Sequence, residues 1–158
     1  EIAARLKAIA AAEEPFSERF LMKRCLSSLG IQKFGAKVEE RMHNLIKLCG
    51  LKREELCGRE YLRRTDKCLD CDFYRIEPNE PIRKSEEDFA PYEIIALIKG
   101  LLENKVSLYA DELTAAVCAE LKIARPSDKL TEFIGECVAL GVSRPLFVRS
   151  ISDRISLC

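Results

Sequence analysis

Cationic and polar side chains recur at helical spacing between residues 33 and 47. The set comprises Lys33, Lys37, Arg41, Asn44 and Lys47. Lysine and arginine neutralise phosphates, while Arg41 or Asn44 carries the hydrogen-bonding groups that reach base edges. The opposite side of the expected helix is apolar, with Val38, Met42 and Leu45. The pattern predicts contact with nucleic acid. The alternative is an ordinary solvated face, because Glu39 and Glu40 interrupt the cations.

Three further cations are expected beside a β-hairpin. Two β-like stretches, residues 60–64 and 72–76, flank a polar turn. The cations placed near the tip of this hairpin are Arg63, Arg64 and Lys67. We expect this group to contact the phosphate backbone beside the helix.

Two cysteines are spaced as half of a zinc site, in Cys68-Leu69-Asp70-Cys71. Thiolates two residues apart can share one tetrahedral metal ion. Cys57 and Cys49 precede the pair, and the four together predict a zinc site that stiffens the hairpin. The spacing is irregular, so the alternative is a pair of free thiols in an exposed loop.

The sequence carries no signature of catalysis. His43 is the only histidine and lies among charged residues of an expected helix, which is typical of a surface residue rather than a catalytic base. No glycine-rich phosphate loop follows a strand. Adjacent acids such as Glu54-Glu55 indicate solvated charge rather than an acid–base couple. We therefore expect a binding module and no enzyme.

An internal duplication supplies the elements that position these residues. With an offset of 92 residues, positions 1–49 align with positions 93–141 without a gap. Apolar positions keep their character, as in the pairs Leu21/Leu113 and Met42/Ile134. A gapless match with one shared periodicity is typical of a duplicated structural unit.

Each copy is expected to contain three helices followed by a hairpin, which is the plan of a winged helix with its helix-turn-helix. The second hairpin is expected at 146–149 and 154–157. Gly50 and Gly141 are expected at helix C-termini with positive φ.

We predict a mainly α fold with small β-hairpins, arranged as tandem winged-helix-like domains. The first domain is expected at 1–78 and the second at 91–158. Residues 79–90 contain prolines among many charges and are expected to form the linker.

The two copies differ in charge. Under the offset, Arg41 becomes Phe133, Asn44 becomes Glu136 and Lys47 becomes Ala139. Residues 1–78 contain 16 basic and 13 acidic residues, net +3, and residues 79–158 contain 10 and 13, net −3. Acidic surfaces repel phosphate, so the second copy is expected to pack or to contact protein, with Phe133 in its core.

Short motifs in the first copy form a recognisable series. They are Glu13-Glu14-Pro15-Phe16, a helix with Lys23-Arg24, then Leu29-Gly30-Ile31 and Gly35-Ala36-Lys37-Val38. The series resembles an uncharacterised bacterial domain family near the C-termini of very large proteins related to superfamily-one DNA helicases, many with an endonuclease-like domain. The second copy departs from it, with no Glu-x-Pro step and with Lys122 in place of the glycine. The resemblance implies a role in nucleic-acid processing beside other domains of a parent protein.

Totals over the chain limit the partners. The formal charge is zero, so no overall basic field attracts nucleic acid or anionic lipid. No apolar run reaches the roughly 20 residues that span a bilayer, and no leader is seen. We therefore expect a cytoplasmic protein with reduced cysteines and no membrane partner. Two functions remain open, a DNA-binding accessory module and a protein-interaction or scaffold module, the latter including a homodimer.

Overall fold

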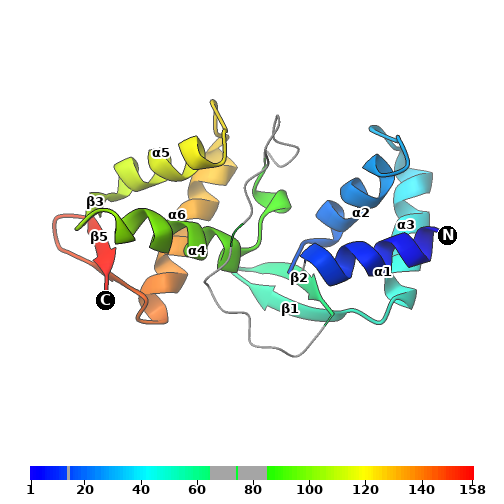
Figure 1. The fold of residues 1–158 in the computed structure, drawn as a ribbon, viewed down its shortest axis with the longest axis horizontal. Coiled ribbons are helices and arrows are strands. Elements are labelled where there is room, and N and C mark those ends of the chain that lie inside the picture. Colours follow the sequence, from blue (N-terminus) through cyan, green and yellow to red (C-terminus); the bar gives the residue numbers. More distant parts are fainter. Residues whose placement is uncertain (14, 65–73, 75–84) are drawn as a thin grey trace. The chain divides into compact units, whose positions relative to one another are not determined.

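The computed structural model describes residues 1–13, 15–64, 74 and 85–158 (Figure 1). The chain divides into two compact units, Glu1–Cys68 and Leu69–Cys158. Over the described residues it is mainly helical, with six α-helices and small antiparallel strands. The coarse prediction of a mainly α chain with small hairpins is confirmed.

The first unit begins with three helices, α1 (Ile2–Glu13), α2 (Glu18–Ser27) and α3 (Ala36–Leu48). Ser17 starts α2, because its Oγ accepts a hydrogen bond from the Phe20 backbone amide at 3.1 Å and so satisfies an otherwise unpaired helix donor. The three helices enclose a core of mainly aliphatic and aromatic side chains: Leu6, Ala10, Phe16, Phe20, Leu21, Met22, Cys25, Leu26, Met42, Ile46 and Leu62.

A hairpin completes the first unit, formed by β1 (Lys52–Leu56) and β2 (Arg59–Arg63). Its turn is Cys57-Gly58, where both residues have positive φ, as a two-residue hairpin turn of the primed type requires. The predicted pairing of residues 60–64 with 72–76 was therefore wrong, because the strand that pairs with β2 precedes it. Of residues 72–76, only Tyr74 is described, and it lies outside any strand.

The second unit repeats this order of elements after a single 3₁₀ turn. Its elements are η1 (Glu86–Asp88), α4 (Pro91–Glu103), β3 (Leu108–Tyr109), α5 (Ala110–Glu120), α6 (Asp128–Ser143), β4 (Phe147–Arg149) and β5 (Arg154–Leu157). The hairpin predicted from residues 146–149 and 154–157 is confirmed as β4 and β5. The strands lie in the order β3-β5-β4.

Strand pairing reproduces the 92-residue offset. In the first unit Phe16, between the first two helices, forms an antiparallel bridge with Leu62 of β2. In the second unit Leu108, 92 residues later, pairs with Ile155 of β5. The helices α5 and α6 also begin 92 residues after α2 and α3. The two units therefore share element order and the way in which the last strand closes onto the helices.

Two turns show what the glycines do. Gly30 has φ +78°, and its counterpart Lys122 keeps the left-handed conformation with φ +58° although it carries a Cβ. Gly50 has φ +65°, as predicted for a residue after a helix. The prediction for Gly141 was wrong, because Gly141 lies inside α6 and is required by the close approach of the Phe147 ring.

Residues 85–90, at the end of the predicted linker, are structured. Ser85 and Asp88 form a capping box around η1, with the Ser85 amide 3.2 Å from Asp88 Oδ2. Phe89 and Ala90 are buried, each only 1% exposed. Residues 79–84 lie outside the described residues. No helix in the described part of the chain is long and apolar enough to cross a bilayer.

Candidate nucleic-acid interface

The predicted polar set lies on and beside α3. Lys37, Arg41, Asn44 and Lys47 are on the helix, and Lys33 lies in the turn that precedes it. All five side chains are exposed. Within the described residues none of them forms a hydrogen bond or an ion pair. Their charges and donors are therefore available to a ligand.

Helical spacing sorts these residues into two sides of α3. At about 100° per residue, Lys37, Arg41 and Asn44 form one stripe, and Lys47 lies toward Glu40 on the neighbouring side. We call Lys37, Arg41 and Asn44, with Lys33 before them, the cationic stripe. Arg41 is central, since it lies four residues after Lys37 and three before Asn44, the spacing at which helical side chains are neighbours.

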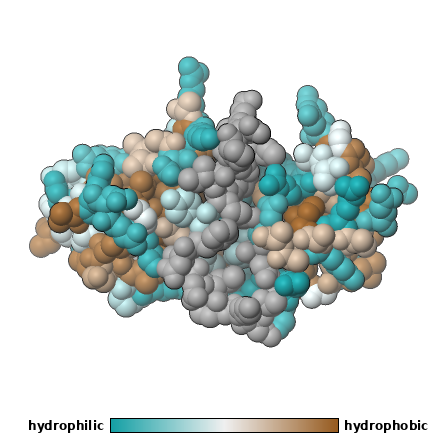
Figure 2. Space-filling model, viewed as in Figure 1, coloured by the Kyte–Doolittle hydropathy of each residue, from teal (hydrophilic) through white to brown (hydrophobic). Residues whose placement is uncertain are grey.

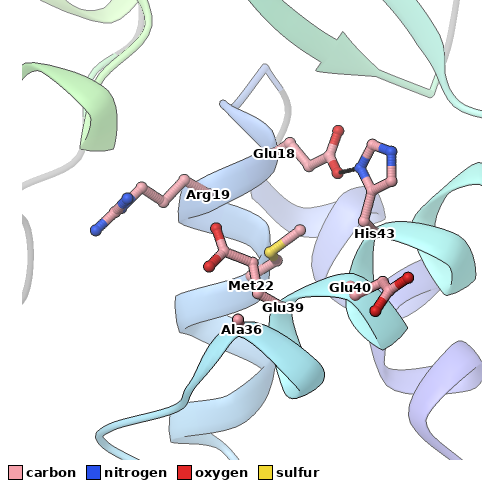
Figure 3. A pocket seen from close by; sticks show the side chains of 7 residues that line it. All are labelled: Glu18, Arg19, Met22, Ala36, Glu39, Glu40 and His43. Carbon is pink, nitrogen blue, oxygen red and sulfur yellow. Dashed lines mark hydrogen bonds and ion pairs between the residues drawn. The ribbon is translucent and has the colours of Figure 1, made fainter.

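The neighbouring side of α3 faces α2 across an open hollow of about 560 Å³ (Figure 3). The hollow is lined by Glu18, Arg19, Met22, Ala36, Glu39, Glu40 and His43. Three carboxylates and one arginine leave this surface with a net negative character, which repels phosphate. The cationic stripe, and not the hollow, is therefore the part of α3 suited to an anionic ligand.

An ion-pair network that the sequence did not reveal crosses this hollow. His43 Nδ1 contacts Glu18 Oε1 (Figure 3), and Glu18 Oε2 lies 3.4 Å from Arg53 Nη1 of β1. Arg53 also pairs with Glu60 of β2. Burial lowers the pKa of Arg53, but the two glutamates outweigh that effect and raise it. The network ties α2, α3 and the hairpin together, and so holds the cationic stripe in place.

The predicted hairpin cations are less available than those of α3. Arg63 Nε lies 3.7 Å from Glu54 Oε2, and the Arg63 side chain is only 23% exposed. Arg63 ends β2 opposite Lys52, so Arg63 and the exposed Arg64 lie at the open end of the hairpin and not near its tip, as predicted. Lys67 lies outside the described residues.

The predicted zinc ligands are only partly described. Cys49 ends α3, where its thiol donates to the Leu45 carbonyl oxygen at 3.3 Å, and Cys57 lies in the β1–β2 turn. The strand between them spans about 13 Å, whereas thiolates of one zinc site lie within about 4 Å of one another. Cys68 and Cys71 lie outside the described residues. Among the residues that are described, no three histidines, cysteines or acids gather as metal ligands.

The second copy lacks the cationic stripe at the equivalent place. Phe133, at the position of Arg41, is fully buried in the core, as predicted. Glu136 and Ala139, at the positions of Asn44 and Lys47, are exposed, and only Lys129 retains the cation of Lys37. An exposed acid with a single lysine offers little to phosphate.

Exposed apolar side chains gather instead around the sheet of the second unit. They are Val106, Tyr109, Val148 and Ile151. Figure 2 shows brown, hydrophobic surface over the strands at the C-terminal end. The guanidinium of Arg154 lies 4.3 Å from the centre of the Tyr109 ring, which fixes the polar edge of this surface. Exposed apolar groups of this kind are typical of protein contact.

Comparison with known proteins adds no assignment. The chain matches no family model, no curated protein and no solved structure. The functional argument therefore depends on the geometry of the described residues and on their charge.

Proposed function

We propose that the chain is a non-catalytic DNA-binding module built from two winged-helix-like repeats, in which the first repeat makes the contact. The proposal is supported by one observation above all: Lys33, Lys37, Arg41 and Asn44 are exposed and, among the described residues, without internal partners. In a helix-turn-helix the second helix of the motif enters the major groove. In this chain that helix is α3, and the hairpin of β1 and β2 corresponds to the wing.

The division of labour between the repeats follows from their charge. The first repeat supplies cations to the backbone, with Arg41 or Asn44 placed to reach base edges. The second repeat supplies packing surface. By resemblance, the module is proposed to serve a larger helicase-like or nuclease-like bacterial protein of the cytoplasm, whose other domains perform the chemistry. A zinc site that includes Cys57, Cys68 and Cys71 remains part of this proposal, as a stiffener of the wing.

Charge reversal tests the proposal directly. Fluorescence anisotropy at about 50 mM salt measures binding of a labelled 20-base-pair duplex to micromolar protein. The double variant Lys37→Glu/Arg41→Glu is expected to abolish binding, since two attractions become repulsions. Lys129→Glu, the matched change in the second repeat, is expected to leave binding intact. Absence of binding by the unaltered chain, or equal loss in both variants, contradicts the proposal.

A protein-interaction or scaffold function is the second candidate, and the exposed residues Val106, Tyr109, Val148 and Ile151 favour it. In this case the chain forms a homodimer or docks a neighbouring domain through the sheet of the second unit. Sedimentation velocity over a range of concentrations distinguishes the candidates. Self-association that Ile151→Ser removes supports the scaffold function, and a monomer at all concentrations contradicts the homodimer.

A further inference from the structure

One side of α3 in the first unit is apolar and yet exposed. Val38, Leu45 and Leu48 follow one another with Arg41 between them, at the three- and four-residue spacing that aligns side chains on a helix. Leu48 is 81% exposed and Val38 is 36% exposed, while Leu45 is partly buried. We call Val38, Arg41, Leu45 and Leu48 the α3 strip. Leaving this much aliphatic surface in water is unfavourable, which indicates a surface built to be covered.

The second copy shows how the same strip is covered. The counterparts of Val38, Arg41 and Leu45 are Leu130, Phe133 and Cys137, and each is 0% exposed. Leu140, the counterpart of Leu48, is partly buried against the same core. The turn η1 lies against α6, and Phe89, the residue that follows it, belongs to the core cluster of Leu130, Phe133 and Cys137. A turn with an aromatic side chain thus closes this side of the helix.

The covering segment has a distinct chemistry. It reads Ser85-Glu86-Glu87-Asp88-Phe89-Ala90, three acids followed by one aromatic residue. The Ser85 hydroxyl lies 3.1 Å from Asp88 Oδ2, so the turn is held by its own side chains. A pre-formed turn loses less conformational entropy when it docks.

The first unit is charged to suit such a segment. Lys33, Lys37 and Arg41 border the α3 strip, and within the described residues none of them has an ion-pair partner. In the second copy Phe133 replaces Arg41, so the covered strip is apolar throughout and the exposed one is cationic at its centre. We infer that the α3 strip of the first unit binds a short acidic protein segment that carries one aromatic side chain, of the kind that residues 85–90 exemplify.

This site goes beyond the proposed DNA contact but shares Arg41 with it. The aromatic side chain would contact Val38 and Leu48, and the acids would contact Lys37 and Arg41. Since a helix face cannot hold a phosphate backbone and an acidic segment at once, the two ligands compete. Binding of the segment would thereby release nucleic acid.

The test uses the full chain and a labelled peptide of residues 84–91, Lys-Ser-Glu-Glu-Asp-Phe-Ala-Pro. Fluorescence anisotropy is expected to show saturable binding, and replacement of the phenylalanine by alanine to weaken it about tenfold or more. Val38→Ser/Leu48→Ser is expected to abolish peptide binding and to leave duplex affinity within about twofold, because no phosphate-binding cation is changed. Val148→Ser, an exposed apolar residue of the second unit, serves as the control and is expected to change neither.

Several results overturn the inference. These are no saturation at about 1 mM peptide, equal binding of the alanine peptide, or unchanged binding to Val38→Ser/Leu48→Ser. Self-association removed by the same double variant assigns the strip to a second copy and also overturns it. Peptide binding without duplex binding contradicts only the proposed function, and duplex binding without peptide binding contradicts only this inference.

Discussion

Two glycines of α6 allow a test of how the second unit is packed. A Cβ built on Gly141 would overlap Cδ2 and Cε2 of Phe147 and lie 3.3 Å from its Cγ. A Cβ on Gly135 would meet nothing within 4 Å. Both glycines lie inside α6. The substitutions Gly141→Ala and Gly135→Ala therefore change helix propensity equally and differ in packing.

The magnitudes follow from these two terms. Gly135→Ala is expected to stabilise the second unit by about 0.5–1 kcal/mol, since alanine loses less backbone entropy in a helix. Gly141→Ala gains the same term but displaces the buried Phe147 ring, at a cost of about 1–3 kcal/mol for overpacking. The free energies of unfolding of the two variants should thus differ by about 1–3 kcal/mol, with Gly135→Ala the more stable.

The assay must report on the second unit alone, because a chain with two units need not unfold in one transition. Urea melts followed by circular dichroism, with hydrogen exchange measured on peptides from residues 128–157, meet that need. The double variant Gly141→Ala/Phe147→Leu is expected to recover part of the loss, because a smaller side chain vacates the overlap. Equal stabilisation by Gly141→Ala and Gly135→Ala would refute the packing of Phe147 on α6.

Three further predictions concern the interface, the cysteines and the segment before α4. If Lys33, Lys37 and Arg41 each neutralise one phosphate, log affinity should fall with log salt at a slope of about −2.7, and Lys37→Gln/Arg41→Gln should reduce it to about −0.9, with roughly 60-fold weaker binding at 0.1 M; an unchanged slope refutes the assignment. Burial raises the pKa of the Cys25 and Cys118 thiols, so mass spectrometry after iodoacetamide treatment at about pH 8 should find the exposed Cys158 alkylated and these two intact, and fast labelling of Cys25 in the folded chain contradicts its burial. Phe89→Ala should destabilise the second unit by about 3–5 kcal/mol in urea melts, and a loss below about 1 kcal/mol would show that Phe89 does not fill the core.

The helices were predictable because their apolar periodicity is strong and occurs twice. Leu6 and Ile98, like Leu21 and Leu113, are fully buried at equivalent positions. A position that is apolar in both copies of a repeat is a core position for the same reason in each. The cationic stripe was predictable on the same basis, since residues opposite a buried stripe face solvent.

The first hairpin was misplaced because β1 lacks the usual pattern of a strand. Its sequence, Lys-Arg-Glu-Glu-Leu, has four charged residues and no apolar alternation. It is a strand because Leu62 of β2 is anchored to Phe16 by two backbone hydrogen bonds, of 3.1 Å and 2.7 Å, and β1 pairs with the strand so fixed. The local signal available was Cys57-Gly58, a two-residue turn ending in glycine.

The contact between Glu18 and His43 was beyond sequence reasoning for a different reason. The two residues are 25 positions apart, on different helices, and neither spacing nor composition relates them. Only the packing of α2 against α3 brings them together. The same packing assigns the acidic side of α3 to the hollow and leaves the cations on the other side, an arrangement that matters more for function than the net charge of either half.

The two units can be compared as a substitution experiment on one backbone. Helix α6 keeps the position and the buried side of α3, but its outer strip is closed by residues 85–90 with Phe89, and Phe133 stands where α3 has Arg41. A buried strip cannot meet a ligand, whatever its sequence. In the first unit the strip is open and bordered by cations, so partner binding is open to that unit alone on this face. The difference in function between the copies therefore follows from whether the third helix is covered, and Arg41→Phe, which removes the central cation, should weaken nucleic-acid binding without unfolding the first unit.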